Sequence, residues 1–327
     1  MYTACVTLLP LALLSVHTST AIVRSQARLH AAAKMQAKED WHEVRARLVA
    51  KEKIERALTN EQLERAVMGI TANESAKKGE PIAAPDFFET PLIEVGSLLL
   101  DAVPGQHSTG QPFFQKSVMV VIEHEAHEFT LGLLLNRPSA CTIDGWRLHY
   151  GGPVGEGGLF HRHETDEVLE SPATPRALLC LHLLDAPHPA SSCSFPVVPG
   201  VWFTTFEQAV RLVEAGEARK ADFVTMCGYC GWGADQLQGE YDRGDWVIAS
   251  SPSVLLRELI SERLDAPHED PSAPSDGIQT WSHLMSRVGR TKTVERANRL
   301  SRGDGALKKW IRTHLGPPTV DEHGAET

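Results

Sequence analysis

The stretch Ser117-Val118-Met119-Val120-Val121-Ile122-Glu123 decides the fold, because it is a short apolar run rich in β-branched residues with polar residues at both ends. A similar run covers residues 95–103 before it, and another covers residues 130–136 after it. We therefore expect three strands that follow one another without an intervening helix. Further strands are expected at residues 147–150 and 177–184.

The second half of the main domain alternates between strand and helix patterns. Thr205 and Gln208 have the spacing of a capping box, and the helix that follows them carries its apolar residues on one face until Gly216 ends it. Besides that helix, the patterns predict strands at residues 201–204, 222–227 and 245–249 and helices at residues 234–241, 252–264 and 279–288.

The charge balance restricts the classes of partner. The chain has 327 residues, with 32 Lys and Arg against 42 Asp and Glu and a net charge of -10. A protein of this sign repels nucleic-acid phosphate and anionic lipid, so we expect no nucleic-acid partner. The apolar run at residues 6–16 is shorter than the roughly 20 residues of a membrane-spanning helix, so we expect no membrane span.

Residues 1–38 are expected to be a targeting leader. Residues 1–21 are signal-like, with an apolar run followed by small residues that end at Ala21, and residues 22–38 are transit-like, with four Lys or Arg and no acidic residue. This order is typical of proteins imported into complex plastids. We therefore expect a plastid (chloroplast) location; the alternatives are the mitochondrion, the secretory route or a leader that is only a disordered N-terminus.

The rest of the chain divides by composition. Residues 39–70 carry apolar side chains at helical spacing and predict a helical extension, and residues 71–91 are rich in Ala, Gly, Lys and Pro and predict a linker. The main domain is expected at residues 92–289. Residues 290–327 are basic and then rich in Gly and Pro, so we expect a loose C-terminal tail.

Two polar clusters suggest chemistry. Glu123-His124-Glu125-Ala126-His127 ends the central strand, but its H-E-x-H spacing is not the H-E-x-x-H that places two histidines one turn apart on a helix, so we assign no metal site. Cys227 and Cys230 form a C-x-x-C motif, which can act as a thiol-redox pair or consist of two small buried fillers.

The glycine-dense segment at residues 151–158 lacks the Lys-Ser/Thr of a phosphate loop and the G-x-G-x-x-G order of a dinucleotide fold, so we interpret it as a turn. The chain also has no G-x-S-x-G elbow. We therefore assign no catalytic residue and no cofactor, and the sequence leans away from an enzyme.

Five separated blocks of the chain resemble the AlgH/YqgE family in their order and spacing. They are residues 96–102, residues 114–118 running on to Glu123-His124, residues 132–138 with Asn-Arg-Pro, residues 150–154 with Gly-Gly-Pro, and residues 228–237 with Gly-Tyr-x-Gly-Trp, together with Trp246. Residues 40–49 are also similar to the N-terminal extension of plant plastid members. The resemblance implies an α/β fold, with α+β as the alternative, in which helices flank a compact mixed β-sheet.

What the resemblance implies about function is limited. The family is largely uncharacterised and has no accepted reaction, and its name comes from a proposed regulatory role in bacterial alginate production. It implies a non-catalytic binding or regulatory module with an unidentified protein partner. The alternatives are a thiol-redox switch or enzyme that uses Cys227 and Cys230, and a small-anion or metal binder.

Carried residue by residue onto this sequence, the family positions give the candidate binding residues Glu123, His124, Asn136, Arg137, Gly151, Gly152, Trp232 and Gln236. Arg137 either presents its planar fork to an anion beside Glu123 and His124, or pairs with Glu123 and ties two strands together. Family members usually have Ala in place of Cys230, which counts against a redox role. The inserts at residues 155–176 and 185–197, which look like long surface loops, also depart from the family.

Overall fold

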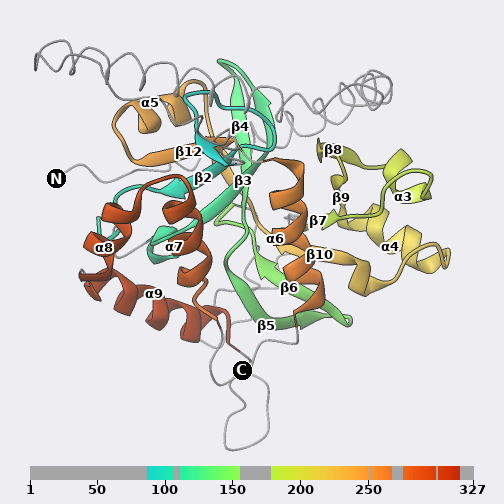
Figure 1. The fold of residues 1–327 in the computed structure, drawn as a ribbon. Helices are drawn as coiled ribbons and strands as arrows, with labels where there is room; N and C mark the ends of the chain where they lie inside the picture. The colour runs from blue at the N-terminus through green and yellow to red at the C-terminus, as the bar shows by residue number, and fades with distance from the viewer. Residues whose placement is uncertain are drawn as a thin grey trace, which may run out of the picture.

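The structure is a computed structural model that describes residues 87–106, 111–154, 178–250, 252–266, 275–299 and 301–316. Within these ranges the strands form two sheets, and helices lie against both of them (Figure 1). The leader at residues 1–38, the helical extension at residues 39–70 and the insert at residues 155–176 lie outside the described residues.

The first sheet contains the three successive strands that the sequence predicts. Its order is β1-β12-β2-β3-β4-β11, and every neighbouring pair is antiparallel. The strands are β1 (Phe88–Glu89), β2 (Leu98–Asp101), β3 (Val118–Glu125), β4 (Phe129–Leu134), β11 (Cys230–Trp232) and β12 (Trp246–Ser250).

The apolar runs of the sequence are continuous because both faces of this sheet are buried. Val118 and Val120 on β3 point into one core cluster, which they share with residues of the second sheet. Met119 and Val121 point into the other cluster, which includes Leu307 near the C-terminus. Successive side chains of a strand alternate between its two faces, so a strand with two cores needs an unbroken apolar sequence.

The second sheet is mixed. Its order is β5-β6-β10-β7-β9-β8, with β6 parallel to β10 and the other pairs antiparallel. The strands are β5 (Pro138–Ile143), β6 (Trp146–Tyr150), β7 (Leu178–His182), β8 (Phe195–Val198), β9 (Val201–Thr205) and β10 (Phe223–Cys227). The predicted fold class, a mixed sheet with flanking helices, is confirmed, and the structure adds that the strands divide into two sheets.

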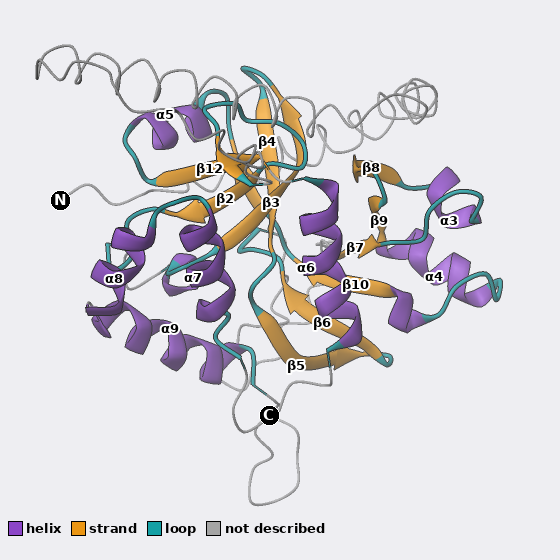
Figure 2. Cartoon of the chain, viewed as in Figure 1, coloured by secondary structure: helices purple, strands orange, loops and turns teal. Residues whose placement is uncertain are grey.

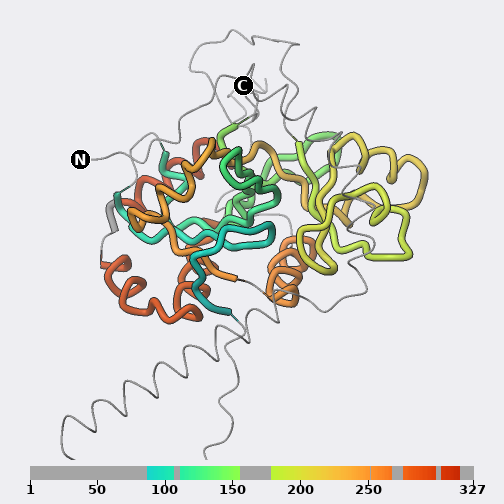
Figure 3. Tube along the Cα trace, turned by 90° about the horizontal axis from the view of Figure 1, so that it is seen from above, coloured from blue at the N-terminus to red at the C-terminus, as the bar shows by residue number. Residues whose placement is uncertain are grey.

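The helices gather in separate groups. They are η1 (Pro112–Phe114), α3 (Pro189–Ser192), α4 (Phe206–Glu214), η2 (Lys220–Asp222), α5 (Gln236–Asp242), α6 (Ser253–Asp265), α7 (Ile278–Arg287), α8 (Thr291–Arg299) and α9 (Ser301–His314). Figures 2 and 3 show α7, α8 and α9 at one end of the molecule and α3 and α4 at the other. Among the described residues, no helix has both the length and the apolarity that a membrane crossing requires.

The C-terminal segment differs from the sequence prediction. Residues 290–327 were expected to be a loose tail, but α8 and α9 occupy residues 291–299 and 301–314. Leu307, Ile311 and Leu315 are spaced four apart and are buried in the core. This apolar stripe, together with the partly buried Trp310, docks a helix that also carries four Lys and Arg. Residues 317–327 lie outside the described residues.

Several further elements were missed, including β11, for which no strand was predicted. β1 lies inside the predicted linker and pairs with β12 at the edge of the first sheet. The insert at residues 185–197, expected to be a loop, contains α3 and most of β8. No strand was predicted at β5, which begins at Pro138, so the Asn-Arg-Pro block that follows β4 connects the two sheets.

Candidate functional site

Arg137 follows β4, and its guanidinium is enclosed by backbone. The residue is fully buried. Nε donates to the carbonyl of Phe113 at 3.0 Å, Nη1 donates to the carbonyls of Asn136 at 2.8 Å and Asp276 at 3.1 Å, and Nη2 donates to the carbonyl of Gln115. These bonds engage four of the five N–H donors of the side chain.

The side-chain contacts of Arg137 are therefore with backbone carbonyls, which are not the partners that either of its two predicted roles names. Neither an ion pair with Glu123 nor a fork open to an anion is among its contacts. The guanidinium instead joins η1 and the residues after β4 to the segment that leads into α7.

Asn136 makes the neighbouring cross-connection. Its Oδ1 accepts the backbone N–H of Val118 at 2.9 Å, and its Nδ2 donates to the carbonyls of Lys116 and Gly277, each at 2.9 Å. Gly277 has a φ of +65°, and a Cβ there would lie 2.0 Å from the Asn136 carbonyl oxygen. Only glycine fits that approach, so Asn136 fixes where α7 begins.

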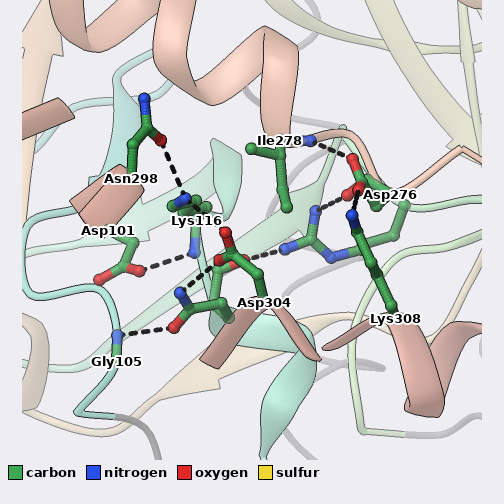
Figure 4. Close-up of polar contacts among 10 residues, drawn as sticks. Asp101, Gly105, Lys116, Asp276, Ile278, Asn298, Asp304 and Lys308 are labelled. Atoms are coloured by element: carbon green, nitrogen blue, oxygen red, sulfur yellow. Dashed lines mark hydrogen bonds and ion pairs between the residues drawn. The ribbon is translucent and has the colours of Figure 1, made fainter. Parts of the chain in front are cut away.

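Lys116 is a buried cation that the sequence reasoning did not single out. It is fully buried and has a φ of +52°. Its Nζ lies 2.8 Å from Oδ2 of Asp304 and 3.3 Å from Oδ1 of Asn298, and 5.6 Å from the centre of the Trp281 ring. Lys116 thus contacts α8 and α9 through Asn298 and Asp304 (Figure 4), and α7 through the Trp281 ring.

Gln115 completes the connection to α9. Its Nε2 donates to Oδ1 of Asp304 at 2.9 Å, and its Oε1 accepts the N–H of Gly105 at 2.7 Å. One carboxylate therefore binds both Gln115 and Lys116. A Cβ at Gly303 would lie 2.6 Å from Oε1 of Gln115, which explains a glycine inside a helix at this position.

We call this set of residues the polar hub; its members are Asp101, Gln115, Lys116, Asn136, Arg137, Asp276 and Asp304. Two buried cations lie among three carboxylates in the hub (Figure 4). Burial lowers the pKa of Arg137 to about 10, while the carboxylates of Asp276 and Asp101 act in the opposite direction. The guanidinium therefore stays charged at neutral pH.

Asp101 and Asp276 position backbone. Asp101 is fully buried, and its carboxylate accepts the backbone N–H of Lys116 at 2.7 Å and of Val103 at 3.0 Å. Asp276 accepts the N–H of Ile278 at 3.0 Å, and its Oδ2 lies 3.6 Å from Nζ of Lys308 (Figure 4). Charged acceptors of backbone N–H groups hold the local conformation.

Glu123 and His124 lie away from the hub. They pair with Leu131 and Thr130 near the start of β4, whereas Asn136 and Arg137 follow its end. Seven residues of extended chain separate Glu123 from Lys116, which is about 20 Å. Nδ1 of His124 lies 2.8 Å from Oγ1 of Thr130, and burial lowers the pKa of the imidazole below its usual value.

Trp232 and Gln236 are brought together by Glu240. This buried carboxylate accepts Nε1 of Trp232 at 2.9 Å and Nε1 of Trp246 at 2.8 Å through Oε2, and Nε2 of Gln236 at 3.1 Å through Oε1. Trp246 lies opposite Asp101 in the sheet. This cluster fastens α5 to the first sheet beside the polar hub.

Gly151 and Gly152 allow two backbone segments to cross. Gly152 has a φ of +152°, and a Cβ there would lie 2.3 Å from the carbonyl carbon of Tyr229. A Cβ at Gly151 would lie 2.2 Å from the carbonyl oxygen of Gly228. The Gly-Gly-Pro block and the Gly-Tyr-x-Gly-Trp block therefore contact each other, and the glycines allow their backbones to approach this closely.

Cys227 and Cys230 are both fully buried. Burial raises the pKa of the Cys230 thiol, and the carboxylate of Glu240 adds to the effect. Its Sγ lies 3.8 Å from the carbonyl oxygen of Gly151. A thiol in such surroundings is poorly converted to the nucleophilic thiolate.

Several residues of this region were not identified from the sequence. Gln115 and Lys116 stand with Ser117 between the apolar Phe114 and Val118, in one of the blocks that resemble the family, and that position was the sequence signal. Asp304 and Glu240 carry no sequence signal of this kind, because each is one acidic residue among other charged residues of its helix. Among the described residues, no group of three or more His, Cys, Asp and Glu side chains is arranged to hold a metal ion.

Comparison with known proteins identifies the family. A model described as AlgH-like matches residues 103–269, which is half of the chain. The UPF0301 protein CT0663 of Chlorobaculum tepidum is 26% identical over 175 residues, which cover 50% of this chain and 79% of that protein. The UPF0301 protein XAC2918 of Xanthomonas axonopodis pv. citri is 29% identical over 179 residues, covering 53% and 86%.

Two solved structures are also similar. The protein DIP2367 from Corynebacterium diphtheriae matches with a TM-score of 0.40 and 16% identity, over 70% of this chain and 97% of that one. The AlgH protein from Pseudomonas aeruginosa matches with a TM-score of 0.39 and 17% identity, over 62% and 92%. On the extent of the family-model match, the chain belongs to the AlgH-like family.

Proposed function

We propose that the protein is a plastid-targeted, non-catalytic binding or regulatory module that acts by holding a protein partner. The observation that carries the proposal is the burial and hydrogen bonding of Arg137, the candidate binding residue best suited to hold an anion. Its guanidinium is fully buried and hydrogen-bonded to four carbonyl oxygens. The residue supports the fold, so binding is left to the surface of the molecule.

An anion could reach Arg137 only by displacing those carbonyls. Each carbonyl left unpaired in the interior costs about 1 to 3 kcal/mol. Glu123 and His124, the other members of the anion or metal alternative, are separated from Arg137 by the length of β3. The lowered pKa of His124 also keeps its ring neutral at neutral pH, which gives it no charge to offer an anion.

The thiol-redox alternative is disfavoured by the surroundings of its two cysteines. Cys227 and Cys230 are buried, and the pKa of the Cys230 thiol is raised. Reactive thiols lie in exposed, electropositive surroundings that lower the pKa. Trp232 and Gln236 also support a fold-stabilising role for the candidate residues, because both donate hydrogen bonds to Glu240.

The experiment is affinity capture of the full chain, tagged at its C-terminus, from an isolated plastid fraction, with proteins and small molecules both identified by mass spectrometry. We expect one protein to be enriched reproducibly over an unrelated tagged protein of similar charge. Recovery of a bound metabolite or metal without any protein partner would contradict the proposal.

The location has its own test. Residues 1–38 fused to a fluorescent protein should direct it to the plastid, and residues 1–21 alone should direct it to the secretory route. Mitochondrial or purely secreted fluorescence from the longer fusion would remove the plastid part of the proposal and leave the binding part standing.

A further inference from the structure

Positive charge is concentrated in the C-terminal helices of an acidic protein. Residues 287–316 contain nine Lys and Arg and two acidic residues, a net charge of +7. The whole chain has a net charge of -10, so the remainder carries -17. Such segregation creates a local positive potential that the net charge conceals.

Helix α8 places three of these cations on one ridge. Lys292, Arg296 and Arg299 follow an i, i+4, i+7 spacing and are all exposed. Val294 and Ala297 are buried on the opposite side of the helix. The three cations, which we call the α8 ridge, therefore face away from the core and extend about 10 Å along the helix axis.

The ridge stands on a fixed support. Asn298 in the same helix contacts Nζ of the buried Lys116 (Figure 4). The buried Val294 and Ala297 add apolar contacts to the first core cluster. A charged surface on a rigid element presents its groups at constant spacing, which lowers the entropy lost on binding.

Neighbouring cations have local partners and the ridge cations do not. Arg290 forms an ion pair with Glu89 at 2.6 Å, and Lys308 lies 3.6 Å from Asp276. Among the described residues, no ion pair engages Lys292, Arg296 or Arg299, and the side chain of Arg299 contacts only a backbone carbonyl of its own helix at 3.4 Å. Glu295 is exposed on the same face, three residues after Lys292 and four before Arg299, but no ion pair joins it to either cation in the described structure, so the ridge cations are available to an external carboxylate.

We propose that the α8 ridge is the docking surface for a short acidic segment of the protein partner, and this rests on the proposed function. Carboxylates about 6 Å apart match the first two cations. That spacing is supplied by Asp or Glu at i and i+4 in a helix, or at alternate residues of an extended segment. The ridge is long enough for three carboxylates.

Charge also explains why the occupant is short. A nucleic acid is a long polyanion that continues beyond a 10 Å ridge and meets the -17 of the remaining chain. At physiological ionic strength the Debye length is about 8 Å, so repulsion acts on whatever extends past the ridge. An acidic peptide segment that ends with the ridge avoids that repulsion.

The test measures binding of the full chain to a fluorescein-labelled 12-residue peptide with Glu at alternate positions, by fluorescence anisotropy in low salt. The test variant carries Lys292→Gln and Arg296→Gln. The matched control carries Arg211→Gln and Arg257→Gln, two exposed cations on α4 and α6. Both variants lose the same charge and retain the basic leader, so its contribution is common to them.

We expect the test variant to bind the peptide about tenfold more weakly than wild type, because each exposed ion pair contributes a factor of about two to five. The control should bind like wild type, and all variants should share one thermal unfolding midpoint. Moderate salt should abolish binding. The same peptide with Gln in place of Glu should not bind.

The proposal is overturned if wild type does not bind the Glu peptide, if both variants bind it equally, or if a 12-nucleotide single-stranded DNA binds more tightly through the same two residues. Capture of a plastid partner equally by wild type and by the test variant would also overturn it, while leaving the binding module intact. Absence of any captured partner would instead contradict the proposed function.

Discussion

Asp304→Ala removes the carboxylate that binds α9 to the sheet side of the molecule. Oδ2 of Asp304 lies 2.8 Å from Nζ of Lys116, and Oδ1 accepts Nε2 of Gln115 at 2.9 Å. The Lys116 side chain is 0% exposed and that of Asp304 is 20% exposed. The substitution therefore leaves a cation in the interior with Asn298 as its remaining side-chain acceptor.

Removing one partner of a buried ion pair destabilises a protein by about 3 to 5 kcal/mol, because the other charge stays desolvated. Asp304 is partly exposed and Asn298 remains, so we expect the lower end, about 3 kcal/mol. Lys116→Met should cost less, about 1 kcal/mol, because the carboxylate left behind can be rehydrated and keeps its bond to Gln115.

The assay is urea unfolding of the full chain at pH 7, followed by tryptophan fluorescence and by far-UV circular dichroism. Hydrogen exchange locates the effect, since amides of α8 and α9 should lose protection by about two orders of magnitude in Asp304→Ala. A loss below about 1 kcal/mol, or a larger loss in Lys116→Met than in Asp304→Ala, would refute the reasoning.

Three further predictions concern single groups. Gly277→Ala should lower the free energy of unfolding by about 2 kcal/mol or more, because φ is +65° and the new Cβ meets the carbonyl of Asn136 at 2.0 Å; an unchanged thermal midpoint would show that α7 begins differently. Cys230, whose thiol pKa is raised by burial, should react with iodoacetamide about a hundredfold more slowly in the folded chain than in denaturant, and equal rates by peptide mass spectrometry would contradict this. Burial lowers the pKa of His149 to about 3 and that of His182 to about 4, against about 6.5 in an unfolded chain, so the unfolded chain binds more protons in between. Stability should be complete above pH 6.5 and fall below it by about 1.4 kcal/mol per pH unit for each histidine, and a urea midpoint that is equal at pH 7 and pH 5 would exclude this contribution.

Four strands of the first sheet, β2, β3, β4 and β12, were predictable from their own apolar runs, whereas β1 and β11 were not predicted. β3 is apolar at every position from Val118 to Ile122, and its short length and β-branched residues favour a buried strand over a buried helix. The helix after Thr205 was equally clear, since Oγ1 of Thr205 accepts the N–H of Gln208 at 3.3 Å as its sequence spacing suggests.

Helix α9 was missed for a physical reason. Its glycines lower the apparent helical signal and its four Lys and Arg lower the apparent apolar signal, while the buried stripe consists only of Leu307, Ile311 and Leu315 with the partly buried Trp310 beside them. Gly303 is unfavourable in an isolated helix. A glycine is needed there because the side chain of Gln115, far away in the sequence, leaves no room for a Cβ. Tertiary packing outweighs the local preference here.

The sequence identified some residues of the candidate site, but it did not identify the groups to which they are hydrogen-bonded. Asn136 and Arg137 were identified from their block, but their partners are mainly backbone carbonyls, which any residue type supplies and no sequence pattern reveals. The bond between Lys116 and Asp304 joins residues 188 apart, so neither marks the other in the sequence. Contacts between residues so far apart depend on the topology of the fold, which cannot be read directly from a single sequence.

Arg137→Lys tests the central claim most directly, through the free energy of unfolding and the amount of partner captured per folded molecule. Lysine keeps the charge but cannot reach the four carbonyls, so we expect a loss of about 3 kcal/mol or more, with partner capture by the folded fraction unchanged. Unchanged stability together with lost capture would show that Arg137 contacts the ligand and would contradict the account.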